Sequence, residues 1–361
     1  MSDSSEKSYI FPFGPTDIFS YIIPGSTAFL LIIIFEHWCR GNFPQVVRTP
    51  FQSIILSTHI ESLNNNVILS IIYLLSALCI VYVAGHVVSS VSSLCLDRTY
   101  TGKGFGYPYE NLLALPKKGG RRREDSMGFY QGLFFWINFY LVLRFLSFFY
   151  PTGPINTGLR ISEWVICLTV ALKIVSSIYL KHRERMRRTP PRWLTSVLKN
   201  YLRNVFPLGG ALSFRVFNNL YNTKARFDSV SIAEYKQSFQ RIFNRDPMDR
   251  GIENFWLCRL FILDKAPEIE RKLTYERHMF IYTRNLATSF YLAFLYCFGW
   301  VFSYRSIVLP DTNPRHFTTL YLPLIYLAAA FFLMGRFRYL YISSYNRLLF
   351  RSFIYLAKSQ N

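Results

Sequence analysis

Acidic side chains are scarce in this chain of 361 residues, which has 21 Asp and Glu against 41 Lys and Arg. No two carboxylates fall together inside an apolar stretch, which argues against a proton-coupled pump or a lipid transferase built on intramembrane acids. The six histidines lack metal-ligand spacing, and the six cysteines include no CxxC pair. We therefore expect no metal site, no cofactor and no disulfide, with the cysteines acting as small hydrophobic residues in a reducing compartment.

Other signatures of chemistry are also missing. The glycine-rich stretch GKGFGYP, residues 102–108, matches neither GxxxxGK[ST] nor GxGxxG. His86 and Ser90 lie one helical turn apart, but no acidic residue on that helix is placed to complete a catalytic set. The N-terminal residues carry two acids against one lysine and lead to no small-residue cleavage site, unlike a secretory signal. We expect a protein that is not an enzyme and that retains its first apolar segment.

Apolar length and positive charge are what the sequence has in abundance. The chain is 51% hydrophobic and 18% aromatic, and its formal net charge is +20. Six stretches approach the roughly 20 largely apolar residues that a membrane-spanning helix needs. They are Ile18–Trp38, Val67–Leu94, Phe129–Tyr150, Glu163–Leu180, Leu286–Ser303 and Phe317–Gly335. The predicted fold is an all-α membrane protein with a bundle of about six transmembrane helices, or four if the third and fourth stretches do not cross.

The distribution of charge predicts the orientation of the chain. With both termini in the cytoplasm, the expected cytoplasmic segments carry +17 and the three expected external loops carry +2, as the positive-inside rule requires. Removing the third and fourth spans together leaves every other segment on the same side. The predicted organisation is a cytoplasmic N-terminus (1–17), a transmembrane hairpin with a basic loop (18–128), a second transmembrane pair (129–180), a basic helical cytoplasmic module (181–285), another transmembrane hairpin (286–335) and a basic cytoplasmic C-terminal helix (336–361).

Helical periodicity is clear inside the expected cytoplasmic module. Ser231 and Glu234 have the spacing of a capping box, and apolar residues recur at helical spacing after them. A second helix is predicted over 253–263. A third, from about Pro267, runs into the fifth span without a helix breaker, and the C-terminal residues continue the sixth span in the same way.

Two arginine-rich clusters stand out, KHRERMRRTPPR at 181–192 and KKGGRRR at 117–123. They have two interpretations: orientation with attraction to anionic lipid, worth about 1 kcal/mol per cation, or a site for a phosphate-rich ligand, since arginine pairs with phosphate in a bidentate manner. Orientation with lipid attraction ranks ahead, because few membrane proteins lack such a cluster. Three separate basic cytoplasmic segments exceed what orientation needs, which raises the second interpretation. The candidate polyanion-binding residues are Arg183, Arg185, Arg187, Arg188, Arg192, Lys117, Lys118, Arg121, Arg122 and Arg123.

Polar residues and helix breakers inside the spans are the pore or gate candidates. A cation in the hydrocarbon is costly, so it faces a bundle interior, a partner or water; alternatively Arg144 snorkels outward and Lys173 marks a segment that does not span. Pro24-Gly25 is either a tolerated bend or a gate hinge. The pore and gate candidates are Arg144, Lys173, Asn138, Pro24 and Gly25, and the predicted helix-packing residues are Gly85, Ser89 and Ser93. Glu36 and His37 are expected at the outer membrane interface.

Several short elements carry a resemblance to known proteins. They are YIIPG at Tyr21–Gly25, the pair Gly85-His86, ENFWLCRLFIL, the RNL of Arg284–Leu286 and the final RFRYLYISSYNRLLFR. In this layout the chain resembles a group of bacterial polytopic membrane proteins that includes antiphage-defence effectors, and its architecture is similar to the oligonucleotide-responsive channel effector of Hailong-type defence. No ligand site is carried over residue by residue.

The resemblance implies a homo-oligomeric channel in the bacterial inner (plasma) membrane. Its state would be set by a polyanionic nucleotide or oligonucleotide signal, without indicating whether the signal opens or closes it. The implied partners are the lipid bilayer, further copies of the chain, and the ligand or the enzyme that makes it. The alternative function is a membrane anchor or interaction protein whose basic surface binds anionic lipid or a soluble partner.

Overall fold

The structure is a computed structural model, and it describes residues 17–42, 67–97, 136–144, 147, 153–186, 229–247, 251–303 and 315–360. Within these ranges the backbone is helical except at 244–247, 266 and 360, and it contains no strand. The chain divides into two compact units. The first is Met1–Leu94 with Thr274–Leu340, and the second is Cys95–Leu273 with Tyr341–Asn361.

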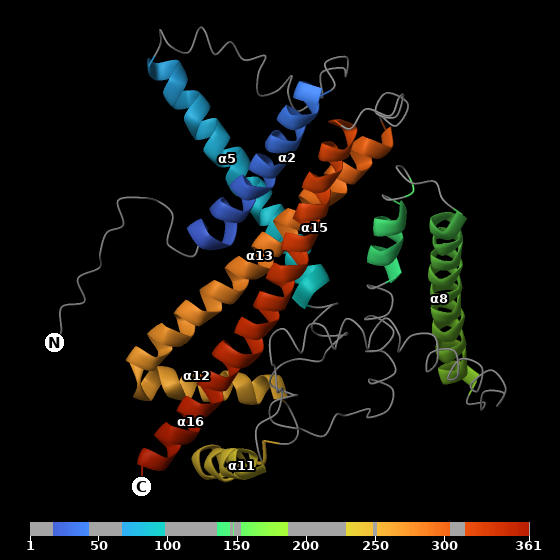
Figure 1. The fold of residues 1–361 in the computed structure, drawn as a ribbon. Helices are drawn as coiled ribbons and strands as arrows, with labels where there is room; N and C mark the ends of the chain where they lie inside the picture. The colour runs from blue at the N-terminus through green and yellow to red at the C-terminus, as the bar shows by residue number, and fades with distance from the viewer. Residues whose placement is uncertain are drawn as a thin grey trace. The chain divides into compact units, whose positions relative to one another are not determined.

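The first unit is built from long apolar helices. It opens with a π-helical turn, η1 (Ile18–Ile22), which continues directly into α2 (Ile23–Asn42). Helix α5 (Val67–Ser92) crosses α2, as Figure 1 shows. The unit also contains most of α13 (Pro267–Ser303) and α15 (Arg315–Tyr339). Such a unit buries side chains between helices and leaves apolar faces outside, where Leu74 and Phe332 are 72% and 65% exposed.

Ring contacts and hydrogen bonds give the directions of three helices in the first unit. Along α2 and α13 the contacts advance together, from Phe19 with Tyr282 to Phe35 with Trp300, so these two helices run parallel. Helices α13 and α15 run antiparallel, because Phe290 contacts Tyr326 while Phe280, earlier in α13, contacts Phe337, later in α15. The antiparallel pair agrees with the hairpin predicted for the last two spans.

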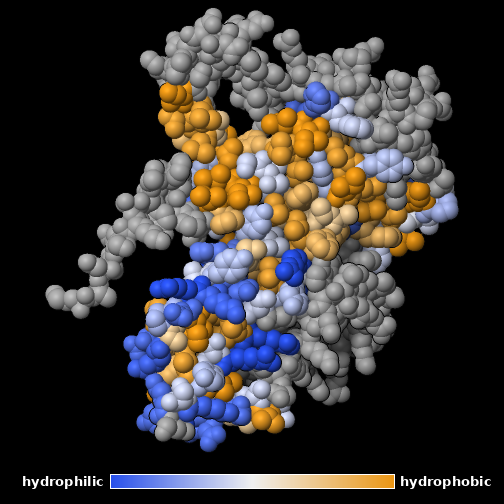
Figure 2. Space-filling view, turned by 60° about the vertical axis from the view of Figure 1, so that its left-hand side comes forward, coloured by the Kyte–Doolittle hydropathy of each residue, from blue (hydrophilic) through white to orange (hydrophobic). Residues whose placement is uncertain are grey.

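Three helical stretches in the described part of the chain are long and apolar enough to cross a membrane: Ile18–Cys39, Leu74–Asp97 and Tyr321–Ser359. They overlap the predicted first, second and sixth spans, which confirms a helical protein with membrane-compatible helices. The predicted fifth span lies in α13, which is not one of the three, and the third is described only at 136–144 and 147. Figure 2 shows orange side chains spread over the apolar helices.

The described part of the second unit includes three short helices, one long helix and the helical stretch 136–144. The short ones are α11 (Ser229–Phe243), α12 (Gly251–Lys265) and α16 (Arg347–Ser359), and α16 follows the π-helical segment η3 (Leu340–Asn346). Both α11 and α12 pack on α16. The long helix α8 (Gly153–Met186) includes the predicted fourth span. It begins ten residues before that span, so residues 153–162, expected to be an external loop, are helical.

An aromatic core joins α11, α12 and α16. Phe353 of α16 contacts Phe243 at a centroid distance of 5.9 Å and Phe261 at 5.4 Å. Beside these rings the Cys258 thiol lies 3.9 Å from the Tyr235 hydroxyl, and both side chains are fully buried. Burial raises the pKa of both groups above their ordinary values, which keeps them neutral and suits a packing role.

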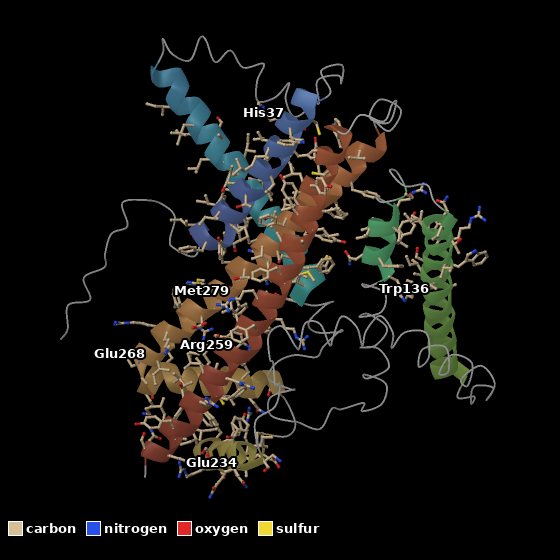
Figure 3. All side chains as sticks on the ribbon, in the orientation of Figure 1. His37, Trp136, Glu234, Arg259, Glu268 and Met279 are labelled. Carbon is tan, nitrogen blue, oxygen red and sulfur yellow. The ribbon has the colours of Figure 1, made fainter. Side chains whose placement is uncertain are left out.

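One buried ion pair links α12 to the first turn of α13. The Arg259 guanidinium, labelled in Figure 3, donates to Glu270 Oε1 from Nε at 3.0 Å and from Nη2 at 2.5 Å. The side chains are 17% and 10% exposed, and the guanidinium also lies over the Trp256 ring at 5.7 Å. Removing one partner of a buried ion pair is costly, because the charge of the other partner stays buried without compensation.

We expect Arg259→Met to destabilise the packing of α12 against the first turn of α13. Losing hydrogen bonds to a charged group costs about 2 to 3 kcal/mol, which corresponds to amide exchange roughly 30 to 150 times faster in peptides from 251–273. Lys265→Ala is the control, because its pair with Asp264 is surface-exposed at both ends and such pairs contribute about 0 to 1 kcal/mol. Equal exchange rates in both variants would contradict a stabilising Arg259–Glu270 pair.

The predicted helices of the module are confirmed, with one corrected end. Helix α12 covers the predicted 253–263, and α13 runs from Pro267 without interruption into the predicted fifth span. The capping box is wrong: α11 begins at Ser229, so Ser231 lies inside the first turn. The predicted helix and the observed α11 contain the same periodic apolar residues. They differ only in where the first turn lies.

Candidate functional site

A helix break at the start of the first candidate span is the origin of the site. Pro24 is buried and lies at the junction of η1 and α2. In an α-helix the Ser20 carbonyl would accept a hydrogen bond from the N–H of residue 24, but proline has no N–H to donate. The chain widens here into a π-turn, in which Ile23 N–H donates to Ile18 O. A buried carbonyl without a donor would destabilise the site.

Two side chains of α13 supply the donors. Asn285 Nδ2 donates to Ser20 O at 2.7 Å, and Ser289 Oγ donates to Pro24 O at 2.8 Å. Asn285 and Ser289 are one helical turn apart and both are fully buried. The parallel packing of α2 and α13 brings this polar pair directly to the broken turn. The break in α2 is therefore completed by side chains from α13.

A buried cation completes the cluster. Arg284, 7% exposed, donates from Nε to Asn285 Oδ1 at 3.1 Å and lies with Nη2 3.5 Å from Ser89 Oγ on α5. Arginine thus holds the Asn285 amide in the orientation that presents its NH₂ to Ser20. The Ser20 hydroxyl is also buried, without a hydrogen-bond partner among the described residues. The cluster therefore joins three helices through polar groups between apolar surfaces.

Glycine allows α2 and α5 to approach at the same level. A Cβ added to Gly85 would lie 2.0 Å from Tyr21 O, and one added to Gly25 would lie 2.3 Å from Val81 O. Both contacts are with backbone, which cannot move aside as a flexible side chain can. Tyr21 then stacks on His86 with ring centroids 3.9 Å apart. The YIIPG element and the Gly85-His86 pair, far apart in sequence, thus form one contact.

The structure places some of the predicted site residues in this cluster and others elsewhere. Pro24, Gly25, Gly85 and Ser89 meet here, and Ser93 lies one turn beyond Ser89 on the same helical stretch.

Two pore candidates lie in the second unit. Asn138 is buried, Arg144 is half-buried, and Arg144 and Glu163 both lie close to Tyr140. Gly158 of α8 contacts Leu143, so the helical stretch 136–144 packs against α8.

The basic candidates are only partly described. The backbone of α8 includes Lys173, Arg183 and Arg185, but the structure does not describe the side chains of these three residues. The remaining candidates also lie outside the described residues: Arg187, Arg188, Arg192, Lys117, Lys118, Arg121, Arg122 and Arg123. A polyanion site at these positions stays a prediction.

Sequence reasoning missed Asn285 and Ser289, and it did not predict the burial of Glu36. Glu36, expected at the outer interface, is only 3% exposed and faces α13. The sequence did contain one signal for the α13 pair. A proline inside an apolar helix leaves the carbonyl four residues earlier without a backbone donor. Asn285 and Ser289, which share one face of a largely apolar helix, are possible donors for it. Pairing that donor with that carbonyl requires the tertiary structure.

Among the described residues no group of three or more His, Cys, Asp or Glu is arranged to hold a metal ion. All six cysteines are free thiols; three are buried and Cys79, Cys95 and Cys167 are exposed. No protein-family model, no curated protein and no solved structure matches the chain.

Proposed function

We propose that the protein is a homo-oligomeric, ion-conducting membrane effector whose state is set from the cytoplasm by a polyanionic nucleotide or oligonucleotide, in bacterial antiphage defence. The observation that carries the proposal is the buried cluster of Arg284, Asn285 and Ser289 against the broken turn at Pro24. Polar and ionisable side chains between membrane helices are costly, and they are typical of ion and substrate pathways. Broken helices at such places supply backbone carbonyls to a polar path.

The broken turn also suggests how the state could change. The Ser20 carbonyl, for which residue 24 has no N–H, and the Pro24 carbonyl both accept hydrogen bonds from side chains of α13. A side-chain hydrogen bond can be exchanged without unfolding the helix, so this junction has two accessible arrangements, with α13 engaged or displaced. Rigid elements joined at such a point are a common basis of switching. The π-turn is consistent with this role, since π-turns are frequent at functional sites.

The helix directions support the proposed topology. Helix α13 runs parallel to α2 and pairs with it from Phe19 to Phe35, so its apolar half shares the depth of the first candidate span. Helix α15 returns in the opposite direction. With the N-terminus inside, α13 leaves the cytoplasm and α15 returns to it, which places the basic C-terminal helix in the cytoplasm. Both termini would then be cytoplasmic.

Conductance of the purified full chain in planar bilayers tests the proposal. We expect single-channel currents that change when a short oligonucleotide is added to the cytoplasmic-facing side and that revert when it is diluted at constant salt. Neutralising Arg183, Arg185, Arg187 and Arg188 to Gln should abolish the response and leave basal currents in place. The matched control neutralises four exposed cations elsewhere, Lys265, Arg271, Lys272 and Arg277, and should retain it. Silent bilayers with inserted, folded protein would contradict conduction.

One observation favours the second candidate, an interaction protein. Trp256, Leu260 and Leu263 share one face of α12 and are 47%, 58% and 51% exposed, opposite the face that packs on the aromatic core. An apolar stripe on a short helix suits docking to a partner. In this case Leu260→Asp should weaken association with the partner or the membrane without changing any current.

A further inference from the structure

A second polar contact joins α2 and α13, away from the helix break. The Tyr296 hydroxyl of α13 donates to Glu36 Oε1 of α2. Twelve residues separate Pro24 from Glu36, which is about 18 Å along the helix at 1.5 Å per residue. The same helix interface therefore has polar groups at two depths.

The chain turns this acid inward. Glu36 is 3% exposed, whereas its neighbours His37 and Trp38 are exposed on α2, His37 as labelled in Figure 3. A residue that only marked the membrane surface would share their orientation. Instead the carboxylate lies inside the first candidate span, Ile18–Cys39, against another helix. Acids in such positions are rare and usually have a functional partner.

The surroundings of the carboxylate are mostly apolar. Phe35 contacts Trp300 with ring centroids 5.5 Å apart, and both rings are buried. The buried thiols of Cys39 and Cys297 lie near the carboxylate, and the buried Tyr326 hydroxyl, which donates to Leu31 O at 2.9 Å, lies near the thiols. Thiols are weak donors, so they compensate a negative charge poorly.

One hydrogen bond to the Glu36 carboxylate comes from a described side chain of α13. A carboxylate has about four acceptor positions, and one donor, the Tyr296 hydroxyl, is placed to use them among the described side chains. An ionised group in such a place must be paired or neutralised. A small cation provides that pairing, with the tyrosine oxygen and the carboxylate oxygens as hard ligands of the kind such ions prefer.

We propose that Glu36, positioned by Tyr296, is an intramembrane binding site for a small alkali-metal cation. The site goes beyond the proposed conduction and does not depend on it. Between it and the broken turn the α2–α13 interface is apolar, with Leu31, Ala293 and Phe294 all buried. The site therefore belongs to the far end of the span and is separate from the Arg284 cluster.

Labelling with dicyclohexylcarbodiimide, a lipid-soluble reagent for buried carboxyl groups, tests the site in the full chain without any current. We expect an adduct at Glu36, located by peptide mass spectrometry, whose formation slows as NaCl or KCl replaces choline chloride. Protection by Na⁺ or K⁺ at fixed pH identifies an alkali-ion site. Labelling that responds to pH but not to Na⁺ or K⁺ would contradict the site, because the reagent attacks the protonated form of any carboxyl group.

Two variants separate binding from packing. Tyr296→Phe removes the hydroxyl and keeps the carboxylate, so the adduct should form while half-protection requires roughly tenfold more cation, the equivalent of about 1.4 kcal/mol. Glu36→Gln keeps an acceptor for Tyr296 and should give no adduct. If Glu36→Gln does not fold, the wild-type labelling still decides, because it needs no variant.

Two outcomes would overturn the proposal. One is the absence of an adduct at Glu36, or an adduct whose formation is indifferent to Na⁺ and K⁺, in folded wild-type protein. The other is labelling that appears only after Arg40→Gln, because Arg40 follows Glu36 by one helical turn in the sequence and a fixed ion pair would then account for the acid. Loss of oligonucleotide-dependent current with normal cation protection would remove the proposed function and leave this site standing.

Discussion

Gly85→Ala should disrupt the crossing of α2 and α5 and destabilise the first unit by about 3 kcal/mol, roughly a hundredfold in the unfolding equilibrium. The added methyl group would lie 2.0 Å from Tyr21 O, which is far inside van der Waals contact. The obstacle is backbone, so relief requires separating the helices and unstacking Tyr21 from His86. The measurement is reversible unfolding of the full chain in mixed micelles, followed by circular dichroism.

Gly299→Ala is the matched control on α13. A Cβ at Gly299 meets no atom within 4 Å, and alanine is a better helix former than glycine by about 1 kcal/mol. This variant should be as stable as the wild type or slightly more stable. Gly25→Ala should resemble Gly85→Ala, because its Cβ would meet Val81 O from the other side of the same crossing. Wild-type stability in Gly85→Ala would show that the two backbones do not touch.

Asn285→Leu should leave the Ser20 carbonyl buried without its donor and cost about 2 kcal/mol. The cause can be isolated, because the carbonyl needs Asn285 only while residue 24 is proline. In the P24A background a main-chain N–H becomes available at position 24, so the cost of N285L should fall below about 1 kcal/mol. The double-mutant cycle therefore predicts a coupling energy of at least about 1 kcal/mol between two residues on different helices.

The control for this cycle is Thr283→Val. Thr283 is as buried as the cluster, but its hydroxyl donates within its own helix to Met279 O at 2.8 Å. Its replacement should cost the same in both backgrounds and show no coupling to Pro24. If N285L costs the same with and without the proline, the contribution of Asn285 comes from its bond with Arg284, and the broken turn is stable on its own.

Hydrophobic periodicity and the positions of helix breakers predicted the helices well. They did not predict features that depend on contacts between distant residues. The periodic residues between Ile232 and Phe243 and the absence of breakers after Pro267 were sufficient for α11 and α13. The first turn of α11 was shifted because Ser231-x-x-Glu234 imitates a cap that the chain does not use. Hydropathy identified the three described stretches that are long and apolar enough to cross a membrane, which overlap the predicted first, second and sixth spans.

The candidate site divides in the same way. Pro24 and Gly85 were identifiable, because proline and glycine carry their backbone consequences wherever they lie. Asn285 and the inward orientation of Glu36 were not, because each depends on a residue of another helix, Ser20 and Tyr296. A polar residue in an apolar segment looks the same in sequence whether it faces lipid headgroups or a neighbouring helix. The side chains of the arginine clusters lie outside the described residues, so their role stays a prediction.

The bond between Asn285 and Ser20 spans 265 residues of sequence, which imposes an order on biosynthesis. At about 5 to 20 residues per second, α2 emerges from the ribosome roughly 13 to 53 s before the residue that completes its broken turn. During that interval the Ser20 carbonyl has no donor from α13, and water, lipid headgroups or an insertion factor must satisfy it. The broken turn at the start of α2 is therefore one of the last parts of the described chain to reach its final structure.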